Sequence, residues 1–212
     1  MELVKQGGFL YLNYYDIIYK SKKQIMENKN MITIGIDIDD TLVQTNKKAL
    51  EIIKREGYPD VEYYEKLQNL SEFINKHFIE IVKTALLFEN ARETICKLKE
   101  KGYRIVLISA RAFQEGADTE EDTIEYLKAN GIIYDTILLR RPNKVEACIQ
   151  EKIDYFIDDK EKTLDTLNEI GVKCIKMQSI DKTESKYAAV SNWYEILSYF
   201  QNWEMNNIKN VD

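Results

Sequence analysis

The 212-residue sequence lacks paired cysteines and long apolar runs. Its three cysteines, Cys96, Cys148 and Cys174, are an odd number without CxxC spacing, which argues against a disulfide framework or a zinc knuckle and favours a reducing cytoplasm. No apolar run approaches the roughly 20 residues of a membrane helix, and the N-terminal FLYLNYYDIIY has no small-residue cleavage site behind it. We therefore expect a cytoplasmic protein that is neither secreted nor inserted in a membrane.

The sequence also lacks an excess of positive charge. Thirty Lys and Arg residues stand against 36 Asp and Glu, which gives a formal net charge of -6 and a pI near 5.1. No basic stripe is present that could follow a phosphate backbone, so we expect no long nucleic acid as a partner. With 44% hydrophobic and 31% charged residues, the length suits one globular domain with a sizeable insertion.

After the first thirty residues, short apolar runs alternate with helical patterns. The runs read ITIGID, RIVLIS, TILL, YFID and KCIKM. This alternation predicts an α/β fold, a Rossmann-like parallel sheet with helices on both faces. Gly102, Gly131 and Gly171 each follow a helical segment and predict its end, and Asn90 with Glu93 resembles a capping pair at a helix start. The C-terminal NWYEILSYFQNW predicts an amphipathic helix that packs on the sheet.

Two segments stand outside this alternation. Residues 45–88 carry helical patterns without a good strand between them, which predicts a small helical cap inserted after the first strand. The core domain then comprises residues 31–44 and 89–212. Residues 1–30 predict a disordered or helical leader that is not part of the core. A native start at Met26 or Met31, or a Tyr-rich docking helix, remains open for this leader.

Three carboxylates, Asp37, Asp39 and Asp40, lie in ITIGIDIDDTLV, which otherwise has the pattern of a buried strand. Buried unpaired carboxylates are costly and repel one another, so the stretch calls for a cation or an incoming reactant. Ligands of open parallel sheets bind at the carboxyl ends of the strands, where the polar residues that follow each run should meet. These residues are Asp37, Ser109, Lys144, Asp158 and Asp159.

The motifs DIDDT, ISAR, a single downstream lysine and IDDK follow one another in that order. They resemble the four motifs of the haloacid dehalogenase superfamily of phosphatases over roughly Met31 to Met177. More narrowly, ISAR followed by TIEYLKANGIIYD resembles bacterial nucleotidases of the 5'(3')-deoxyribonucleotidase type. The resemblance implies a fold of the haloacid dehalogenase type and a phosphomonoesterase whose small phosphorylated substrate is a nucleoside monophosphate.

The residues themselves suggest how a phosphate monoester would be cleaved. The reaction needs a nucleophile, an acid for the leaving group, and cations that offset charge on the phosphoryl group. Asp37 is the expected nucleophile and forms an aspartyl-phosphate, while Asp39 is the expected acid and then the base. Oxygen-rich ligation favours Mg²⁺. The metal ligands would be Asp37, the backbone carbonyl of Asp39, and Asp158, with Asp159 acting through water.

Three further residues are expected to bind phosphate. Ser109 and Lys144 would hold phosphoryl oxygens, and Thr41 would add a hydroxyl near the turn. Lys144 would also balance the acids so that Asp37 remains ionised. The residues that compete with Lys144 for this role are Arg140, Arg141 and Lys160.

Other candidates carry weaker signals. Arg111 in ISAR is expected to be a structural residue or one that binds substrate. Tyr63, Tyr64 and Phe73 in the cap are candidates for stacking a nucleobase, although aromatic residues at helical spacing usually belong to a core. His77, the single histidine, is expected to be a packed or exposed helix residue, because the mechanism does not need it.

Two alternatives remain beside the nucleotidase. The first is a phosphatase of sugar phosphates or other small metabolites, which keeps the same chemistry. The second is a phospho-accepting signalling module or a non-catalytic binding module. Receiver modules place their acidic pair before the phosphorylated Asp, whereas here Asp37 comes first, which disfavours that alternative. Dehalogenation is disfavoured because Asp39 would have no task. A homodimer is left open.

Overall fold

The computed structural model describes residues 31–57, 76–111, 119–178 and 184–208. The chain divides into two units, Met1–Met31 and Ile32–Asp212, and the fold described here is that of the second. The predicted leader, residues 1–30, lies outside the described residues. So do the cap aromatics Tyr63, Tyr64 and Phe73, whose predicted roles stay predictions.

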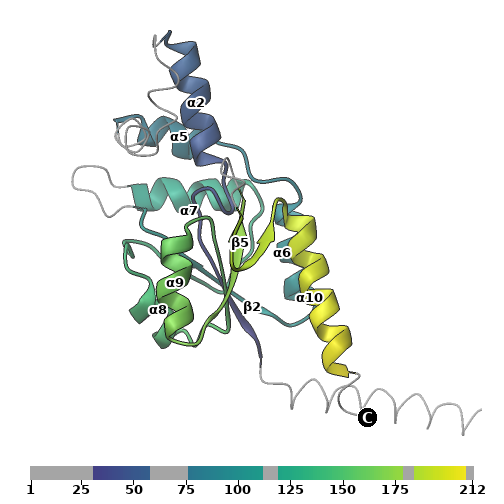
Figure 1. Ribbon diagram of the computed structural model, residues 1–212. Coiled ribbons are helices and arrows are strands. Elements are labelled where there is room, and N and C mark those ends of the chain that lie inside the picture. The colour runs from purple at the N-terminus through teal and green to yellow at the C-terminus, as the bar shows by residue number, and fades with distance from the viewer. Residues whose placement is uncertain (1–30, 58–75, 112–118, 179–183, 209–212) are drawn as a thin grey trace, which may run out of the picture. The chain divides into compact units, whose positions relative to one another are not determined.

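A six-stranded parallel sheet in the order β3-β2-β1-β4-β5-β6 forms the centre of this unit (Figure 1). All five predicted strands are present, and the predicted α/β fold is confirmed. A sixth strand was missed, because it is only three residues long and two of these are exposed alanines. The strands are β1 (Thr33–Ile36), β2 (Arg104–Ile108), β3 (Thr136–Leu138), β4 (Tyr155–Asp158), β5 (Lys173–Met177) and β6 (Ala188–Val190).

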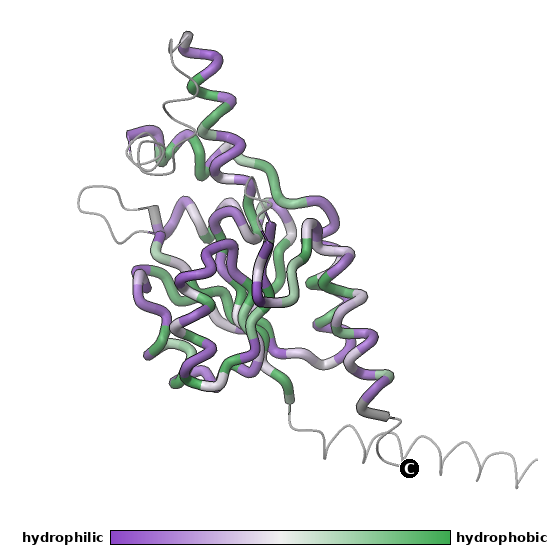
Figure 2. The backbone as a smooth tube through the Cα atoms, viewed as in Figure 1, coloured by the Kyte–Doolittle hydropathy of each residue, from purple (hydrophilic) through white to green (hydrophobic). Residues whose placement is uncertain are grey.

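Helices cover both faces of the sheet, as predicted (Figure 1). The first face packs Trp193 and Phe200 against Ile34 and Ile36, and the second packs Leu164 and other residues against Val106 and Phe156. Figure 2 shows the hydrophobic residues gathered along the central strands, whereas hydrophobic and hydrophilic residues alternate along the helices. The helices on the first face are α6 (Ala91–Glu100), α7 (Thr119–Ala129) and α10 (Trp193–Ile208), and those on the second are α8 (Val145–Gln150) and α9 (Glu161–Glu169).

The predicted helix ends and the predicted helix start at Asn90 are confirmed, whereas the capping pair predicted at that start is not. Gly102, Gly131 and Gly171 each follow a helix with a positive φ, a conformation that costs glycine little. Asn90 precedes α6, yet its own φ is 62° and its side chain makes no capping hydrogen bond. The predicted capping pair of Asn90 and Glu93 fails because an N-cap residue needs an extended backbone, not a left-handed one.

The insertion after β1 contains two described helices, α2 (Thr45–Arg55) and α5 (Phe78–Thr84). Arg55 Nη1 lies 2.5 Å from Glu80 Oε1 and joins them, and the Tyr126 hydroxyl of α7 donates a 2.6 Å hydrogen bond to the Ala85 carbonyl that follows α5. Both helices lie beyond the carboxyl ends of the strands (Figure 1). No helix in the described ranges is long and apolar enough to cross a membrane.

Gly35 lies in the middle of β1, where no side chain would fit. A Cβ atom at this position would lie 2.4 Å from Phe156 Cδ2 and 3.1 Å from Ile153 Cγ2. The missing side chain therefore lets the Phe156 ring pack directly against the β1 backbone. This contact belongs to the sheet position where β1 pairs with β4.

We expect Gly35→Ala to lower the free energy of unfolding by about 1–3 kcal/mol, because the added methyl overpacks a buried site. Urea unfolding of the purified protein measures this. Phe156→Leu makes room, so the double variant should be more stable than the sum of the two single effects predicts. A loss below about 0.5 kcal/mol for Gly35→Ala would contradict the packing argument.

Candidate active site

The polar residues predicted to converge lie at the carboxyl ends of neighbouring strands. Asp37 follows β1, Ser109 follows β2, and Asp158 ends β4 and is followed by Asp159. Lys144 caps the start of α8. From β1 the chain adds β2 and β3 on one side of the sheet, and β4, β5 and β6 then follow on the other side. Ligands of open α/β sheets bind in the crevice at such a switch point, which here lies between β1 and β4.

Lys144 joins the ends of the two central strands. Its Nζ donates to Asp37 Oδ1 at 2.7 Å and to Asp158 Oδ2 at 2.6 Å. All three residues are buried, with 7% of the Lys144 residue exposed and none of Asp158. The ammonium group also lies 5.2 Å from the centre of the Phe156 ring. One buried cation therefore balances two buried anions, and the cluster keeps an excess of negative charge.

The charges in this cluster shift one another's protonation. Burial raises the pKa of Asp37 to about 6; Lys144 opposes the rise, and the neighbouring Asp158 and Asp39 add to it. Burial lowers the pKa of Lys144, but the attraction of Asp37 and Asp158 outweighs burial and raises it above the ordinary value. Lys144 therefore keeps its charge at neutral pH.

Asp37, Asp158 and Asp159 offer carboxylate oxygens that all lie within 4.8 Å of one another. Asp159 Oδ1 is buried and accepts no hydrogen bond from the described residues. Burial and the repulsion of Asp158 and Asp37 raise the Asp159 pKa well above its usual range. A buried carboxylate oxygen without a partner is costly unless it meets a cation, and an all-oxygen set suits a hard ion such as Mg²⁺. These residues therefore fit a magnesium ion.

Asp39 is held from two sides. Arg111 binds it through Nε, at 3.1 Å from Oδ1 and 3.0 Å from Oδ2, and through Nη2, at 2.7 Å from Oδ1. The hydroxyl of Thr45, the first residue of α2, donates to Oδ1 at 2.6 Å. Burial raises the pKa of Asp39, but Arg111 and Thr45 together lower it by more, so the pKa lies below its ordinary value. The sequence analysis did not foresee this pair.

The turn after Asp39 has its own supports. Asp40 has a φ of 56°, a left-handed conformation that Asp tolerates better than most residues, and its Oδ1 accepts the Asn46 backbone N–H at 2.9 Å. The indole N–H of Trp193 donates to the Thr41 carbonyl at 2.9 Å. The Thr41 hydroxyl is buried and has no partner among the described residues. Its predicted part in phosphate binding stays a prediction.

Ser109 is buried, and its hydroxyl accepts the Arg111 backbone N–H at 3.2 Å. This hydrogen bond lies within the turn that Ser109 itself begins, so the phosphate role of Ser109 also stays a prediction. Among the residues that compete with Lys144, Arg140 and Arg141 are exposed, and their backbone N–H groups donate to the carbonyls of Arg111 and Ser109. Of these cations, Lys144 is the one seen to bridge the acids.

Lys176 is a site residue that the sequence analysis missed. It is buried in β5, in register with Asp158 of β4, and its Nζ donates to the Asp159 backbone carbonyl. It thereby supports the turn that carries the second acidic residue. The signal was the position of a lysine inside the apolar strand KCIKM, but only the strand pairing shows that it adjoins the acidic pair.

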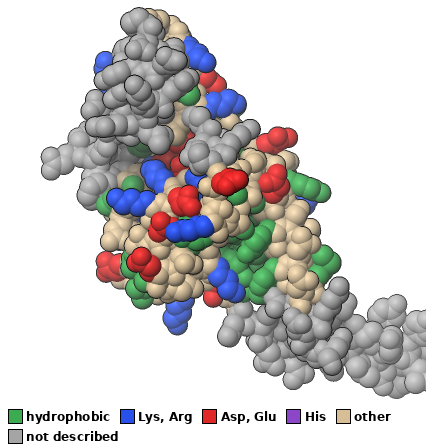
Figure 3. All heavy atoms as spheres, in the orientation of Figure 1, with side chains coloured by type: hydrophobic (Ala, Val, Ile, Leu, Met, Phe, Trp, Pro, Cys, Tyr) green, Lys and Arg blue, Asp and Glu red, His purple; other side chains and the backbone are tan. Residues whose placement is uncertain are grey.

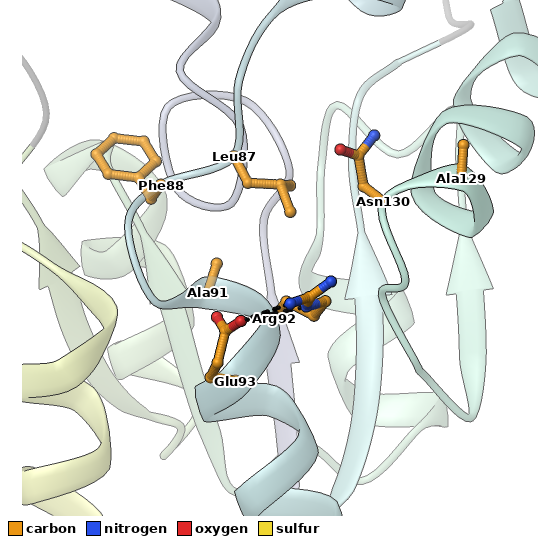
Figure 4. Close-up of a pocket in the computed structure, with 7 residues that line it drawn as sticks. All are labelled: Leu87, Phe88, Ala91, Arg92, Glu93, Ala129 and Asn130. Carbon is orange, nitrogen blue, oxygen red and sulfur yellow. Dashed lines mark hydrogen bonds and ion pairs between the residues drawn. The ribbon is translucent and has the colours of Figure 1, made fainter.

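His77 is half-buried at the start of α5, with Nε2 at 3.9 Å from Glu56 Oε2, and its contacts fit the expected packed helix residue. A hollow of about 280 Å³ lies elsewhere, between the start of α6 and the end of α7 (Figure 4). Arg92 and Glu93 pair with each other at 2.8 Å in its lining. None of the predicted site residues that the structure describes lines this hollow. Its lining is Leu87, Phe88, Ala91, Arg92, Glu93, Ala129 and Asn130.

Acidic and basic side chains are mixed on the face of the molecule that Figure 3 shows. No stripe of one sign runs across that face. The expectation that no long nucleic acid binds, drawn from net charge, stays a prediction.

We expect Lys144→Ala to lower the free energy of unfolding by about 3–5 kcal/mol, because Asp37 and Asp158 would stay buried without their cation. Thermal or urea unfolding in chelator measures this without a bound metal ion that could replace the lysine. Lys162→Ala on the exposed side of α9 is the matched control and should change stability by less than about 0.5 kcal/mol. If the two variants were equally stable, the proposed contribution of Lys144 to the stability of the fold would be contradicted.

No protein-family model matches the chain. Two bacterial relatives carry the name "putative nucleotidase". The one from Oceanobacillus iheyensis is 29% identical over 188 residues, 79% of this chain and 98% of the relative. The one from Bacillus cereus is 28% identical over 151 residues, 63% of this chain and 79% of the relative.

The fold is also found among solved structures. A haloacid dehalogenase-like hydrolase from Streptococcus pneumoniae superposes with a TM-score of 0.57 at 14% identity, over 80% of this chain and 98% of that structure. Identity at this level is informative about the fold alone. The chain thus has the fold of the haloacid dehalogenase superfamily of hydrolases, and in sequence it resembles the two nucleotidase-named relatives.

Proposed function

We propose that the protein is a Mg²⁺-dependent phosphomonoesterase that acts through an aspartyl-phosphate, with nucleoside monophosphates as its substrates. The observation that carries this proposal is the environment of Asp37. Its carboxylate is buried at the end of β1, Lys144 binds its Oδ1, and two further carboxylates adjoin it. A buried nucleophile beside a fixed cation, in an acidic cluster that fits a metal ion, is the arrangement that phosphoryl transfer requires.

In the first step, Asp37 Oδ2 attacks phosphorus while the bond from phosphorus to the leaving oxygen breaks. Lys144 binds Oδ1 and so orients Oδ2 for the attack. Asp39 takes up a proton before this step, because Arg111 and Thr45 hold its pKa low in the free protein, and delivers it to the leaving oxygen, which departs as an alcohol. The bound magnesium ion would supply positive charge that offsets the charge on the phosphoryl oxygens.

In the second step, water attacks the aspartyl-phosphate. Asp39, now ionised, accepts a proton from this water, and the bond between phosphorus and Asp37 breaks. Inorganic phosphate leaves, and both carboxyl groups return to their starting forms. Asp39 can serve both steps because it lies two residues from the nucleophile, beyond the end of the strand.

The remaining roles follow from position. Asp37, the Asp39 carbonyl and Asp158 would hold the magnesium ion, with Asp159 acting through water. Ser109, Lys144 and Thr41 would hold the phosphoryl oxygens. The insertion, residues 45–88, would be a cap that covers the leaving group, and the core domain would comprise residues 31–44 and 89–212.

A nucleoside monophosphate is the most specific substrate in this proposal. It is supported by the name of the two bacterial relatives and by the aromatic composition of the insertion. Tyr63, Tyr64 and Phe73 would stack the base, and Arg111 would lie on the substrate side. A phosphatase of sugar phosphates uses the same groups, so the choice between these substrate classes depends on measured rates.

We expect Asp37→Asn to abolish turnover while the protein stays folded, because an amide has nearly the same shape and is a poor nucleophile. Phosphate release together with circular dichroism measures both properties. The matched control is Asp165→Asn, which alters an acidic residue on α9 outside the site. Activity of Asp37→Asn near that of the control would rule out the aspartyl-phosphate.

A phosphate-release panel tests metal and substrate together. We expect activity in Mg²⁺, none in excess chelator, and recovery when Mg²⁺ is restored. The kcat/KM values for nucleoside monophosphates should exceed those for hexose phosphates, because a flat, partly apolar base suits an aromatic cap better than a polyol does. If the kcat/KM values were highest for sugar phosphates, the protein would be assigned as a metabolite phosphatase. Activity in excess chelator would contradict the proposed dependence on Mg²⁺.

A further inference from the structure

Arg111 is a buried charged residue that contacts the proposed acid. Its side chain has no exposed surface, whereas 25% of the Asp39 side chain is exposed. The guanidinium group uses Nε and Nη2 to bind the Asp39 carboxylate as a fork. Asp39 is therefore the more accessible member of the pair. Among the described residues, the side-chain hydrogen bonds of Arg111 go to Asp39, while its Nη1 is buried without a partner.

The two oxygens of Asp39 are bound unequally. Oδ1 accepts the two shortest hydrogen bonds, from Arg111 Nη2 at 2.7 Å and from the Thr45 hydroxyl at 2.6 Å. Oδ2 accepts the longer contact from Arg111 Nε at 3.0 Å. A carboxylate oxygen offers two lone pairs, so Oδ2 keeps room for a proton while Oδ1 is filled.

Arg111 is itself held by the insertion. Its guanidinium carbon lies 5.9 Å from the centre of the Phe78 ring on α5, within the range of a cation–π contact. Its backbone is held from the core side, because its N–H donates to the Ser109 hydroxyl and its carbonyl accepts the Arg140 N–H at 2.9 Å. The side chain thus spans from the core, past Asp39, to α5.

We propose that Arg111 is a positioning residue for proton transfer: its fork fixes the Asp39 carboxylate so that Oδ2 faces the leaving oxygen, and Phe78 keeps the fork in place. This inference rests on the proposed phosphatase function. The proton passes from Asp39 Oδ2 to the leaving oxygen as the phosphorus–oxygen bond breaks. Arg111 gains and loses no proton. Its contribution is geometric, and it vanishes when Asp39 can no longer act as an acid.

A substitution of Arg111 by lysine separates the effect of the fork geometry from the effect of the positive charge. Arg111→Lys keeps a positive charge near Asp39 but loses the planar fork that binds a carboxylate through two nitrogens. Two substrates with different leaving groups show whether the effect falls on proton transfer. A p-nitrophenyl leaving group departs readily without a proton, whereas an alkyl leaving group needs one. Single-turnover measurement of leaving-group release isolates this first step from the hydrolysis that follows.

We expect Arg111→Lys to slow release of the alkyl group by about 10-fold or more and release of p-nitrophenol by no more than about 3-fold, since general acid catalysis contributes about 10²- to 10⁴-fold. In an Asp39→Asn background, Arg111→Lys should cause less than about 3-fold further loss for the alkyl substrate, because the residues act as one unit. Phe78→Leu should show the same preference with a smaller loss. Ile79→Ala, on the exposed side of α5, is the matched control and should show no loss.

Each other result overturns the proposal. Equal slowing of both substrates by Arg111→Lys would make the residue merely structural, and a KM increase that persists in the Asp39→Asn background would make it a substrate ligand. If Arg111→Lys does not fold, the leaving-group preference of Phe78→Leu decides, and equal slowing of both substrates overturns the inference. Failure of the wild-type chain to release phosphate from either substrate would instead refute the proposed function.

Discussion

The burial of negative charge at the carboxyl edge of the sheet is the constraint on which the rest of the site depends. Asp37 and Asp158 end adjacent strands and are almost completely buried. Such carboxylates stay ionised only when a cation is fixed beside them, and Lys144 meets that need at 2.7 Å and 2.6 Å. The same ion pairs fix the start of α8 to the ends of β1 and β4, so the charge balance of the site is also part of the fold.

Packing beneath the site supports this electrostatic arrangement. The Phe156 ring occupies the space that a side chain on Gly35 would take, and Lys144 lies over the same ring. Gly35 of β1 and the bridging cation Lys144 therefore both adjoin the Phe156 ring. A residue with no chemistry of its own thus helps to set where the Lys144 ammonium lies relative to Asp37.

The sequence predicted those features that depend on the order of residues along one segment. Apolar runs ending in Asp37, Ser109 or Asp158 identify strands, and the parallel topology then brings their ends to one edge. Contacts between segments could not be predicted in this way. The fork of Arg111 on Asp39 depends on how the chain turns after β2, and the support from Lys176 depends on strand register.

The contacts divide the site into two halves with different origins. Among the described residues, the side chains that bind or adjoin Asp37 come from the start of α8 and the end of β4, through Lys144 and Asp158. Asp39 instead takes Thr45 from the first turn of α2, and it takes Arg111 from the core, where Phe78 of α5 covers the guanidinium group. In the proposed mechanism, changes in the insertion would therefore alter the half that faces the leaving group while the proposed nucleophile, Asp37, keeps its surroundings. Such a division would let substrate choice change without loss of the proposed chemistry.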